Sequence, residues 1–190
     1  MKKRVAVLIS GSGSNLQALI DAAKAPDYPA EIALVLSNKA DAYGLTRARN
    51  AGIPTHVVSH KHFAAREAFD DAMHEVLTAQ HIDIICLAGF MRVLTDGFVG
   101  KWMGKMINIH PALLPKYKGL HTHQRAIDAG EKEAGCTVHW VVPEVDGGEI
   151  IAQARVPVLP GDTAETLATR VLVEEHRIYP EALRNIALVT

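Results

Sequence analysis

Residues 5–15 read Val5-Ala6-Val7-Leu8-Ile9-Ser10-Gly11-Ser12-Gly13-Ser14-Asn15. The apolar half of this stretch predicts a buried β-strand, and the glycines and serines that follow predict a tight turn. Apolar residues then recur at helical spacing, and prolines end that pattern: Leu16, Leu19, Ile20 and Ala23, then Pro26 and Pro29. A strand, a short turn and a helix make the first half of a parallel βαβ unit.

The alternation of strand and helix continues along the first two thirds of the chain. Strands are expected at residues 32–36, 55–58, 82–88 and 106–109, and helices at residues 45–51 and 63–80. This order predicts an α/β protein with a doubly wound, mostly parallel, Rossmann-like sheet. Because ligands of such sheets bind outside the carboxyl ends of the strands, we expect the functional residues there.

The last third of the chain has a different pattern. Residues 136–142 and 150–158 are rich in β-forming residues, which predicts an antiparallel pair added to the parallel sheet. Asp162 and Thr163 are suited to cap a final helix, with Glu165 in its first turn. No repeat or linker interrupts the chain, so we expect a single domain over residues 1–190.

Composition narrows the class of protein. The 190 residues are 48% hydrophobic and 22% charged with a net charge of -1, which suits one globular domain and argues against a non-specific nucleic-acid binder. Cys86 and Cys136 lie in apolar runs and are expected to be buried free thiols in a reducing compartment. The apolar run after Arg4 is too short for a signal peptide or a membrane span, so a cytoplasmic protein without membrane contact is expected.

The glycine and serine turn predicts either a phosphate site or an ordinary connection. Glycines allow an anion to approach the backbone, and the free amides at a helix start donate hydrogen bonds to it. Leu16 stands where a dinucleotide fingerprint requires its third glycine, and no Gly-Lys-Ser/Thr sequence completes a Walker loop. The turn therefore gives no support to an NAD or ATP site.

A second stretch carries the chemistry: Ile107-Asn108-Ile109-His110-Pro111. Asn108 and His110 are two residues apart, so in a strand they share one face. Asp146 follows another apolar run and precedes two glycines. An amide donor for an oxyanion, an imidazole and a carboxylate are the groups that acyl transfer needs without a covalent nucleophile.

Each part of this set also has a purely structural interpretation. Asn108 and His110 could end a strand with satisfied polar groups, and Asp-Gly-Gly is a common turn. Whether His110 or Asp146 carries the proton stays open at this point. His121, His123 and His139 lack partners at familiar zinc-ligand spacing, so no metal is expected.

Several segments resemble the folate-dependent formyltransferases, and the likeness extends over nearly the whole chain. It is carried by residues 8–11, 14–17, 37–40, 87–92, 108–119, 121–123 and 135–148. The resemblance implies a nucleotide-binding N-terminal half and a folate cleft completed by the C-terminal half. It also implies transfer of a formyl group from 10-formyltetrahydrofolate, a co-substrate, to the amine of 5-phosphoribosylglycinamide in purine synthesis.

The same resemblance implies roles for particular residues. The catalytic set is Asn108, His110 and Asp146. The ribonucleotide set is Gly11, Ser12, Gly13, Ser14, Asn15 and Glu175. The folate set is Arg66, Met91, Arg92, Val93, Leu94 and Asn108. Two positions depart from the family pattern, because Ser12 stands where some members have Asn and Pro143 stands where an acidic residue is usual.

Other functions remain to be compared with this one. A formyltetrahydrofolate hydrolase would share the folate site but would not need a phosphate loop. A methionyl-tRNA formyltransferase would be expected to add a tRNA-binding domain and a basic surface. A catalytically silent nucleotide-binding module would leave the Asn-His-Asp set unexplained. We expect small-molecule substrates, no nucleic-acid partner, and a monomer or homodimer.

Overall fold

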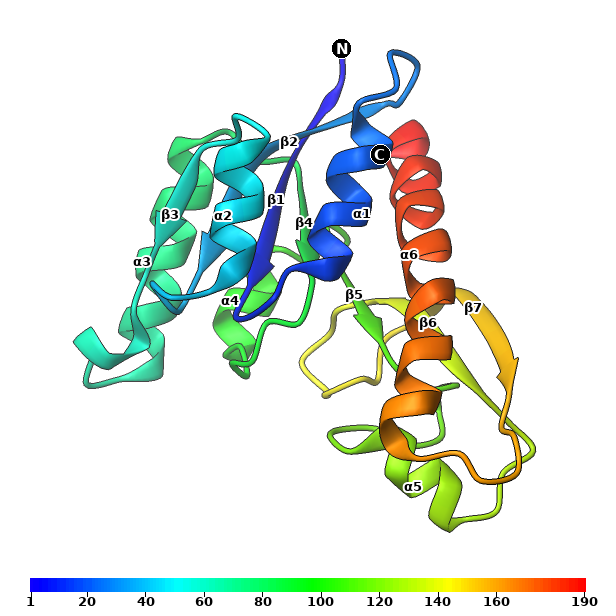
Figure 1. Ribbon diagram of the computed structural model, residues 1–190. Helices are drawn as coiled ribbons and strands as arrows, with labels where there is room; N and C mark the ends of the chain where they lie inside the picture. The colour runs from blue at the N-terminus through cyan, green and yellow to red at the C-terminus, as the bar shows by residue number, and fades with distance from the viewer.

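A single seven-stranded sheet forms the centre of the molecule. The structure is a computed structural model that describes residues 1–190. The strands lie in the order β3-β2-β1-β4-β5-β6-β7 (Figure 1). The first five of these run parallel, β6 is antiparallel to β5, and β7 is antiparallel to β6. Their bounds are β1 Lys3–Ile9, β2 Ala30–Ser37, β3 Thr55–Val57, β4 Ile84–Leu87, β5 Met106–His110, β6 Glu133–Trp140 and β7 Ile150–Pro157. The expected α/β fold with an antiparallel C-terminal addition is confirmed.

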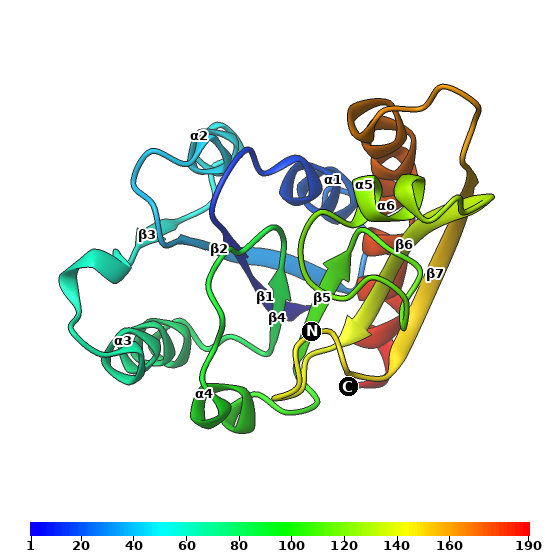
Figure 2. The ribbon, with the colours of Figure 1, turned by 90° about the horizontal axis from the view of Figure 1, so that it is seen from below.

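Helices cover both faces of the sheet (Figure 2). Helices α1, α2 and α6 pack on one face and α3 and α4 on the other, as the two separate core clusters show. Their bounds are α1 Ser14–Ala23, α2 Tyr43–Asn50, α3 Arg66–Ala79, α4 Asp96–Lys101, α5 Thr122–Asp128 and α6 Ala164–Val189, with a short 3₁₀ turn η1 at His60–His62.

The apolar run of β1 explains this layering. Val5 and Val7 belong to the cluster beneath α1 and α6, whereas Ala6 and Leu8 belong to the cluster beneath α3. Side chains of a strand alternate between faces, so a strand covered on both sides must be apolar throughout. Each large aliphatic side chain buried in this way contributes about 1.5–3 kcal/mol of transfer free energy.

The strand order reverses between β1 and β4. The chain proceeds outward from β1 to β2 and β3, then returns and continues through β4 and β5 on the other side. The segments that leave the carboxyl ends of β1 and β4 therefore diverge around a gap, which is where ligands of doubly wound sheets bind. Figure 2 looks onto this end of the sheet.

Several sequence expectations need correction. The helix expected at 63–80 begins only at Arg66, because residues before it are extended and Phe63 packs its ring edgewise on Phe69 with centroids 6.0 Å apart. Helices α4 and α5 were not expected at all. The final helix is capped by Thr163, as expected, through a reciprocal box with Thr166, while Asp162 instead pairs with Arg170 at 2.8 Å.

Candidate active site

The three expected catalytic residues lie together at the carboxyl end of β5. Asn108 and His110 come from β5, and Asp146 comes from the loop between β6 and β7, where its backbone is left-handed with φ 54°. His110 is 5% exposed, and its Nδ1 lies 3.6 Å from Asp146 Oδ2. The separation is longer than a hydrogen bond, so the carboxylate faces the imidazole without closing on it.

A fourth residue, His139 on β6, completes the cluster. It pairs with Asn108 across the β5–β6 ladder, and its Nε2 lies 3.2 Å from Asn108 Nδ2 and 3.7 Å from Asp146 Oδ1. Its Nδ1–H donates to the carbonyl of Trp140 at 3.0 Å. Burial lowers the pKa of His139, which favours the neutral ring.

This neutral ring determines how Asn108 is oriented. With its proton on Nδ1, His139 offers only a lone pair at Nε2, so it accepts a hydrogen bond from the Asn108 amide nitrogen. Asn108 consequently presents an N–H, and not its carbonyl, on this side. From the sequence alone, His139 was a candidate only for a metal site. Its two-residue alternation with Thr137 and its pairing with β5 become informative only when the strand register is known.

The backbone of residues 116–120 contacts the other two members of the cluster. His110 Nε2 donates to the carbonyl of Tyr117 at 2.8 Å, because a carbonyl can only accept. Asp146 Oδ2 accepts from the backbone N–H of Gly119 at 2.9 Å. The proton on His110 Nε2 is thereby fixed, and Nδ1 is the nitrogen that faces Asp146.

The glycine loop after β1 is held against α2. Gly13 has φ 73°, and a Cβ atom there would lie 2.7 Å from the Cα of Gly44. The backbone N–H of Gly44 donates to the Gly11 carbonyl at 3.0 Å. Only glycine satisfies both the left-handed conformation and the close approach, so the loop and the start of α2 form one rigid unit.

Charged and polar side chains surround this loop. Arg47 of α2 donates from Nε to the Ser12 carbonyl at 2.7 Å, and its guanidinium lies 5.0 Å from the Tyr43 ring centroid. Asn15 donates to Glu175 Oε1 of α6 at 3.0 Å, while Asn15 Oδ1 is buried without a partner. Glu175 is 7% exposed, not solvent-facing, and burial raises its pKa.

Residues 91–94 of the expected folate set lie on the irregular segment between β4 and α4, whereas Arg66 begins α3 and Asn108 is on β5. Met91 is 60% exposed and Val93 is 61% exposed, whereas Leu94 packs against the core beneath α3. Arg66 donates from Nη2 to the Val93 carbonyl at 2.6 Å, and the Arg92 guanidinium lies 5.9 Å from the Phe69 ring centroid. Arg66 therefore organises this segment as well as presenting charge beside it.

Two buried polar groups fix the ends of the same segment. The Ser10 hydroxyl donates to Asn38 and accepts from the Met91 N–H at 2.8 Å, which joins the glycine loop to residue 91. Asp70, 3% exposed, accepts from both the N–H and the hydroxyl of Thr95 at 2.7 Å. The segment thus projects apolar side chains from a fixed backbone.

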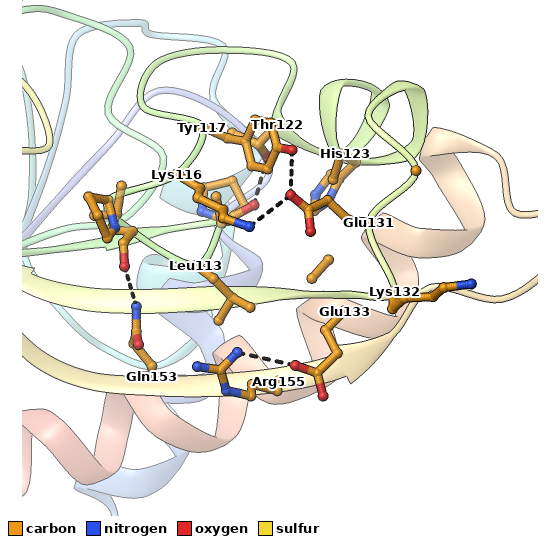
Figure 3. Close-up of a pocket in the computed structure, with 17 residues that line it drawn as sticks. Leu113, Lys116, Tyr117, Thr122, His123, Glu131, Lys132, Glu133, Gln153 and Arg155 are labelled. Atoms are coloured by element: carbon orange, nitrogen blue, oxygen red, sulfur yellow. Dashed lines mark hydrogen bonds and ion pairs between the residues drawn. The ribbon is translucent and has the colours of Figure 1, made fainter.

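A cavity of about 530 Å³ lies beside residues 111–117, among α5, the first part of β6 and the middle and later part of β7 (Figure 3). It does not include Asn108, His110 or Asp146. Its lining contains two ion pairs, Lys116–Glu131 and Arg155–Glu133. The chemistry belongs to the cluster at the strand ends, where the titratable groups meet, and not to this cavity.

Two further observations concern the whole of residues 1–190. No group of three or more His, Cys, Asp or Glu side chains is arranged to hold a metal ion. None of the helices is both long enough and apolar enough to cross a membrane. Cys86 and Cys136 are free and buried, as expected, and burial raises the pKa of each thiol to about 12.

A doubly wound sheet with an Asn-His-Asp cluster at its strand ends, beside a glycine loop and an exposed apolar segment, defines a class of group-transfer proteins. The family model described as formyl transferase matches residues 3–183. The chain belongs to the formyl transferase family.

Individual relatives carry names that are more specific than the family. Phosphoribosylglycinamide formyltransferase from Haemophilus influenzae is 52% identical over 182 residues, covering 96% of this chain and 86% of the relative. The crystal structure of phosphoribosylglycinamide formyltransferase from Brucella melitensis has a TM-score of 0.95 and 56% identity, covering 100% of this chain and 98% of that chain. The trifunctional purine biosynthetic protein adenosine-3 of Bos taurus is 56% identical over 186 residues. This chain spans only 18% of that relative's length.

Proposed function

We propose that this chain is an enzyme that transfers the formyl group of 10-formyltetrahydrofolate to the amine of 5-phosphoribosylglycinamide. The products are formylglycinamide ribonucleotide and tetrahydrofolate, a step of de novo purine biosynthesis. One observation carries the proposal: the Asp146 carboxylate faces the rings of His110 and His139, at 3.6 and 3.7 Å, with the Asn108 amide beside them. The identities to enzymes named phosphoribosylglycinamide formyltransferase support the choice of substrates.

The cluster suits a direct transfer through a tetrahedral intermediate. The amine nitrogen attacks the formyl carbon, the carbonyl oxygen becomes an oxyanion, and the bond from the carbon to N10 of the folate then breaks. One hydrogen of the Asn108 amide is engaged by His139, and the other remains for the oxyanion. A donor of this kind typically lowers the barrier by about 3 kcal/mol.

His110 and Asp146 provide the remaining stabilisation of charge and the transfer of protons. Protonated His110 presents Nδ1–H toward Asp146 and the oxyanion, because its Nε2–H is held by the Tyr117 carbonyl. Asp146 stabilises this cation and accepts the proton that leaves the attacking amine, directly or through a water molecule. The N10 leaving group takes up one proton as its bond to carbon breaks. The proton that Asp146 accepted from the amine supplies it, so the enzyme returns to its starting protonation state.

The ribonucleotide is proposed to bind at the glycine loop. Its phosphate accepts hydrogen bonds from the backbone N–H groups and hydroxyls of residues 11–14, at the N-terminus of α1. No lysine or arginine lies within the loop itself, and Arg47, anchored to the Ser12 carbonyl, is the cation beside it. Asn15 and Glu175 are suited to hydrogen-bond the ribose, and the partnerless Asn15 Oδ1 supports this.

The folate is proposed to bind along residues 91–94. Exposed Met91 and Val93 offer apolar contact to a pterin ring, and the backbone of this segment offers donors and acceptors to its polar edge. Arg66 and Arg92 lie on the same side and provide positive charge for the carboxylates of the folate tail. Asn108 then reaches the formyl group from β5.

Each rival function either leaves a feature of the site unexplained or requires a surface that the sequence does not support. A formyltetrahydrofolate hydrolase would have no use for the rigid loop at Gly13 or for the buried Asn15–Glu175 contact. A silent nucleotide-binding module would not explain why a carboxylate faces two imidazoles. A methionyl-tRNA formyltransferase needs an RNA-binding surface, and the chain's net charge of -1 gives no support to one.

A coupled assay tests the proposal. Formation of tetrahydrofolate is followed with the folate donor alone, with glycinamide ribonucleotide added, and with glycinamide ribonucleoside lacking the phosphate. We expect turnover only with an amine acceptor and a much higher KM without the phosphate. Equal rates with and without the acceptor would indicate a hydrolase and contradict the proposal.

The setting of the enzyme is part of the proposal. We propose one formyltransferase domain over residues 1–190 that acts on small molecules in the cytoplasm, as a monomer or homodimer. The two free, buried cysteines fit a reducing compartment. The folate is a co-substrate, and no metal is required, because proton transfer and hydrogen bonds from protein groups suffice for the chemistry. Activity that is lost on exhaustive chelation and restored by zinc alone would contradict this last point.

A further inference from the structure

Residues 116–120 lie in the connection between β5 and α5, and their backbone makes two contacts to the catalytic cluster. The Tyr117 carbonyl accepts from His110 Nε2 at 2.8 Å, and the Gly119 N–H donates to Asp146 Oδ2 at 2.9 Å. The position of this segment therefore decides where the proton of His110 sits and how Asp146 is held. Neither contact involves a side chain of the segment.

The segment is not held by regular secondary structure. Tyr117 has φ 57° and Gly119 has φ 84°, and the residues between β5 and α5 form no strand or helix. A left-handed backbone at a bulky residue such as tyrosine is unfavourable and persists only where surrounding contacts enforce it. Side chains around the segment provide those contacts.

Glu131, between α5 and β6, supplies the first anchor. Its Oε1 accepts from the Tyr117 hydroxyl at 2.8 Å and from Lys116 Nζ at 3.0 Å, as the dashed lines in Figure 3 show. The bond from Lys116 and then the bond from Tyr117 lower the pKa of the Glu131 carboxyl, so it is ionised at neutral pH. One carboxylate thus holds two successive residues of the segment.

Arg125, on α5, supplies the second anchor. Its Nη1 donates to the carbonyls of Lys118 at 2.7 Å and Leu120 at 3.0 Å, and its guanidinium lies 5.3 Å from the Tyr117 ring centroid. A planar guanidinium that satisfies two carbonyls and stacks on an aromatic ring fixes a turn better than a lysine would. Both anchors bond to the segment, and neither is hydrogen-bonded to His110 or Asp146.

We propose that Glu131 and Arg125 are positioning residues, which fix the backbone of residues 116–120 so that its Tyr117 carbonyl and Gly119 N–H orient His110 and Asp146. The inference rests on the proposed formyl transfer for its kinetic consequence, but its structural consequence can be measured without substrate. When the anchors are lost, the Tyr117 carbonyl moves away and the neutral His110 ring is free to carry its proton on either nitrogen. In the protonated ring used for catalysis, loss of the Nε2–H bond to the Tyr117 carbonyl leaves Nδ1–H poorly aimed at Asp146 and the oxyanion, even when every catalytic side chain is present.

The kinetic test compares Glu131→Ala with Glu133→Ala as a matched control. Glu133 lines the same cavity and pairs with Arg155 at 3.2 Å, but it contacts no residue of the segment (Figure 3). We expect Glu131→Ala to lower kcat about tenfold with both KM values changed less than about threefold, as is typical when a contact that orients a site residue is lost. Glu131→Gln, which keeps an acceptor oxygen for the Tyr117 hydroxyl, should recover much of the loss. Glu133→Ala should match the wild type.

A spectroscopic test is independent of activity. The ¹⁵N signals of the His110 ring report which nitrogen carries the proton, and in the free wild-type enzyme we expect a protonated Nε2. In Glu131→Ala and in Arg125→Gln the signals should shift toward a mixture of tautomers. If Glu131→Ala fails to fold, Tyr117→Phe, which removes only the hydroxyl, should show the same change to a smaller extent.

Unchanged His110 signals in the folded variants would overturn the proposal, whatever the kinetics show. Equal losses of kcat in Glu131→Ala and Glu133→Ala would also overturn it, since that result would reflect a general effect on the cavity. If the wild type transferred no formyl group while the His110 signals shifted as expected, the proposed function would fail and the positioning role would stand.

Discussion

At the scale of single residues, Asn108 shows how the site controls a small polar group. Its side-chain amide has two hydrogens, and the lone pair of His139 Nε2 engages one of them at 3.2 Å. Because burial lowers the pKa of His139, the ring stays neutral and continues to accept that bond at neutral pH. The amide is therefore held with an N–H available, which is the orientation that an oxyanion requires.

Asp146→Asn tests the catalytic set at this scale. The substitution keeps the size of the side chain but removes the charge that faces His110, so kcat should fall by at least about a hundredfold. The ribonucleotide affinity should change little, since the contacts of Asp146 are with His110, His139 and Gly119 and not with the glycine loop. Steady-state kinetics and calorimetry measure the two effects.

The double variant Asp146→Asn/His110→Ala provides the control. If both residues act on one transition state, the double variant should be little slower than the more impaired single variant. Near-normal turnover in a folded Asp146→Asn enzyme would leave Asp146 as a turn residue only.

At the scale of elements, the glycine loop and α2 depend on each other. Gly44 lies directly against Gly13, and its N–H is bonded to the Gly11 carbonyl, so the start of α2 supports the loop from outside. Arg47 is placed beside the loop by the same packing, one turn further along α2. The proposed phosphate site thus combines two elements that are more than twenty residues apart in sequence.

Gly13→Ala should damage this unit, and Gly11→Ala serves as its control. A Cβ at position 13 would meet the Gly44 Cα at 2.7 Å and require φ 73°, whereas nothing lies within 4 Å of a Cβ at position 11. The left-handed strain and the clash together should lower the free energy of unfolding by about 2–4 kcal/mol at position 13. Urea unfolding measures this.

Binding measurements complete the comparison. The Gly13→Ala enzyme, where folded, should lose affinity for the ribonucleotide more than for the folate, because only the loop is displaced. Equal stability of the Gly11→Ala and Gly13→Ala proteins would contradict the tight contact between the loop and α2.

The secondary-structure elements differ in how clearly the local sequence predicts them. The apolar runs of β1, β4 and β5 and the Gly-Ser turn are local signals, and so they predicted the parallel sheet and the loop after β1. Helices α4 and α5 have only six and seven residues, too short for a periodic pattern to emerge. The role of His139 depends on the register of β6 against β5, and the anchors Glu131 and Arg125 act through backbone atoms of a distant turn. Local spacing in the sequence reveals neither the strand register nor the contacts of these two anchors.

At the scale of the whole molecule, three histidines are held in their neutral form. Burial is the main cause that lowers the pKa of His123, His139 and His176. Nearby His110 also lowers the pKa of His123 and His139, and nearby Arg47 also lowers the pKa of His176. Each binds a proton more readily in the unfolded chain, where its pKa is near 6.5. Their contribution to stability is therefore complete above pH 6.5 and is lost as the pH falls through and below that value.

The double variant His123→Gln/His176→Gln tests this without altering the catalytic cluster. The free energy of unfolding of the wild type should fall between about pH 7.5 and about pH 5.5, by up to about 1.4 kcal/mol per pH unit for each histidine. The variant should fall less steeply over the same range. Urea titrations at several pH values measure both slopes, and parallel slopes would show that these two histidines do not contribute.

The fold joins the two substrate sites at one place. The glycine loop leaves β1, the folate segment leaves β4, the catalytic residues end β5, and the Ser10 hydroxyl links the first two through its contact with the Met91 N–H at 2.8 Å. The reversal of strand order between β1 and β4 opens the space in which both substrates can meet. This geometry supports the proposed direct transfer between them without a covalent enzyme intermediate.

Following the formyl carbon itself tests that central claim most directly. The enzyme is given 10-formyltetrahydrofolate with ¹³C in the formyl group, together with glycinamide ribonucleotide, and the label is located by NMR. We predict that the label appears in the formylated amine of the ribonucleotide in an amount equal to the tetrahydrofolate formed, and that Asp146→Asn slows its appearance. Label that appears as formate in the presence of the ribonucleotide would contradict the account.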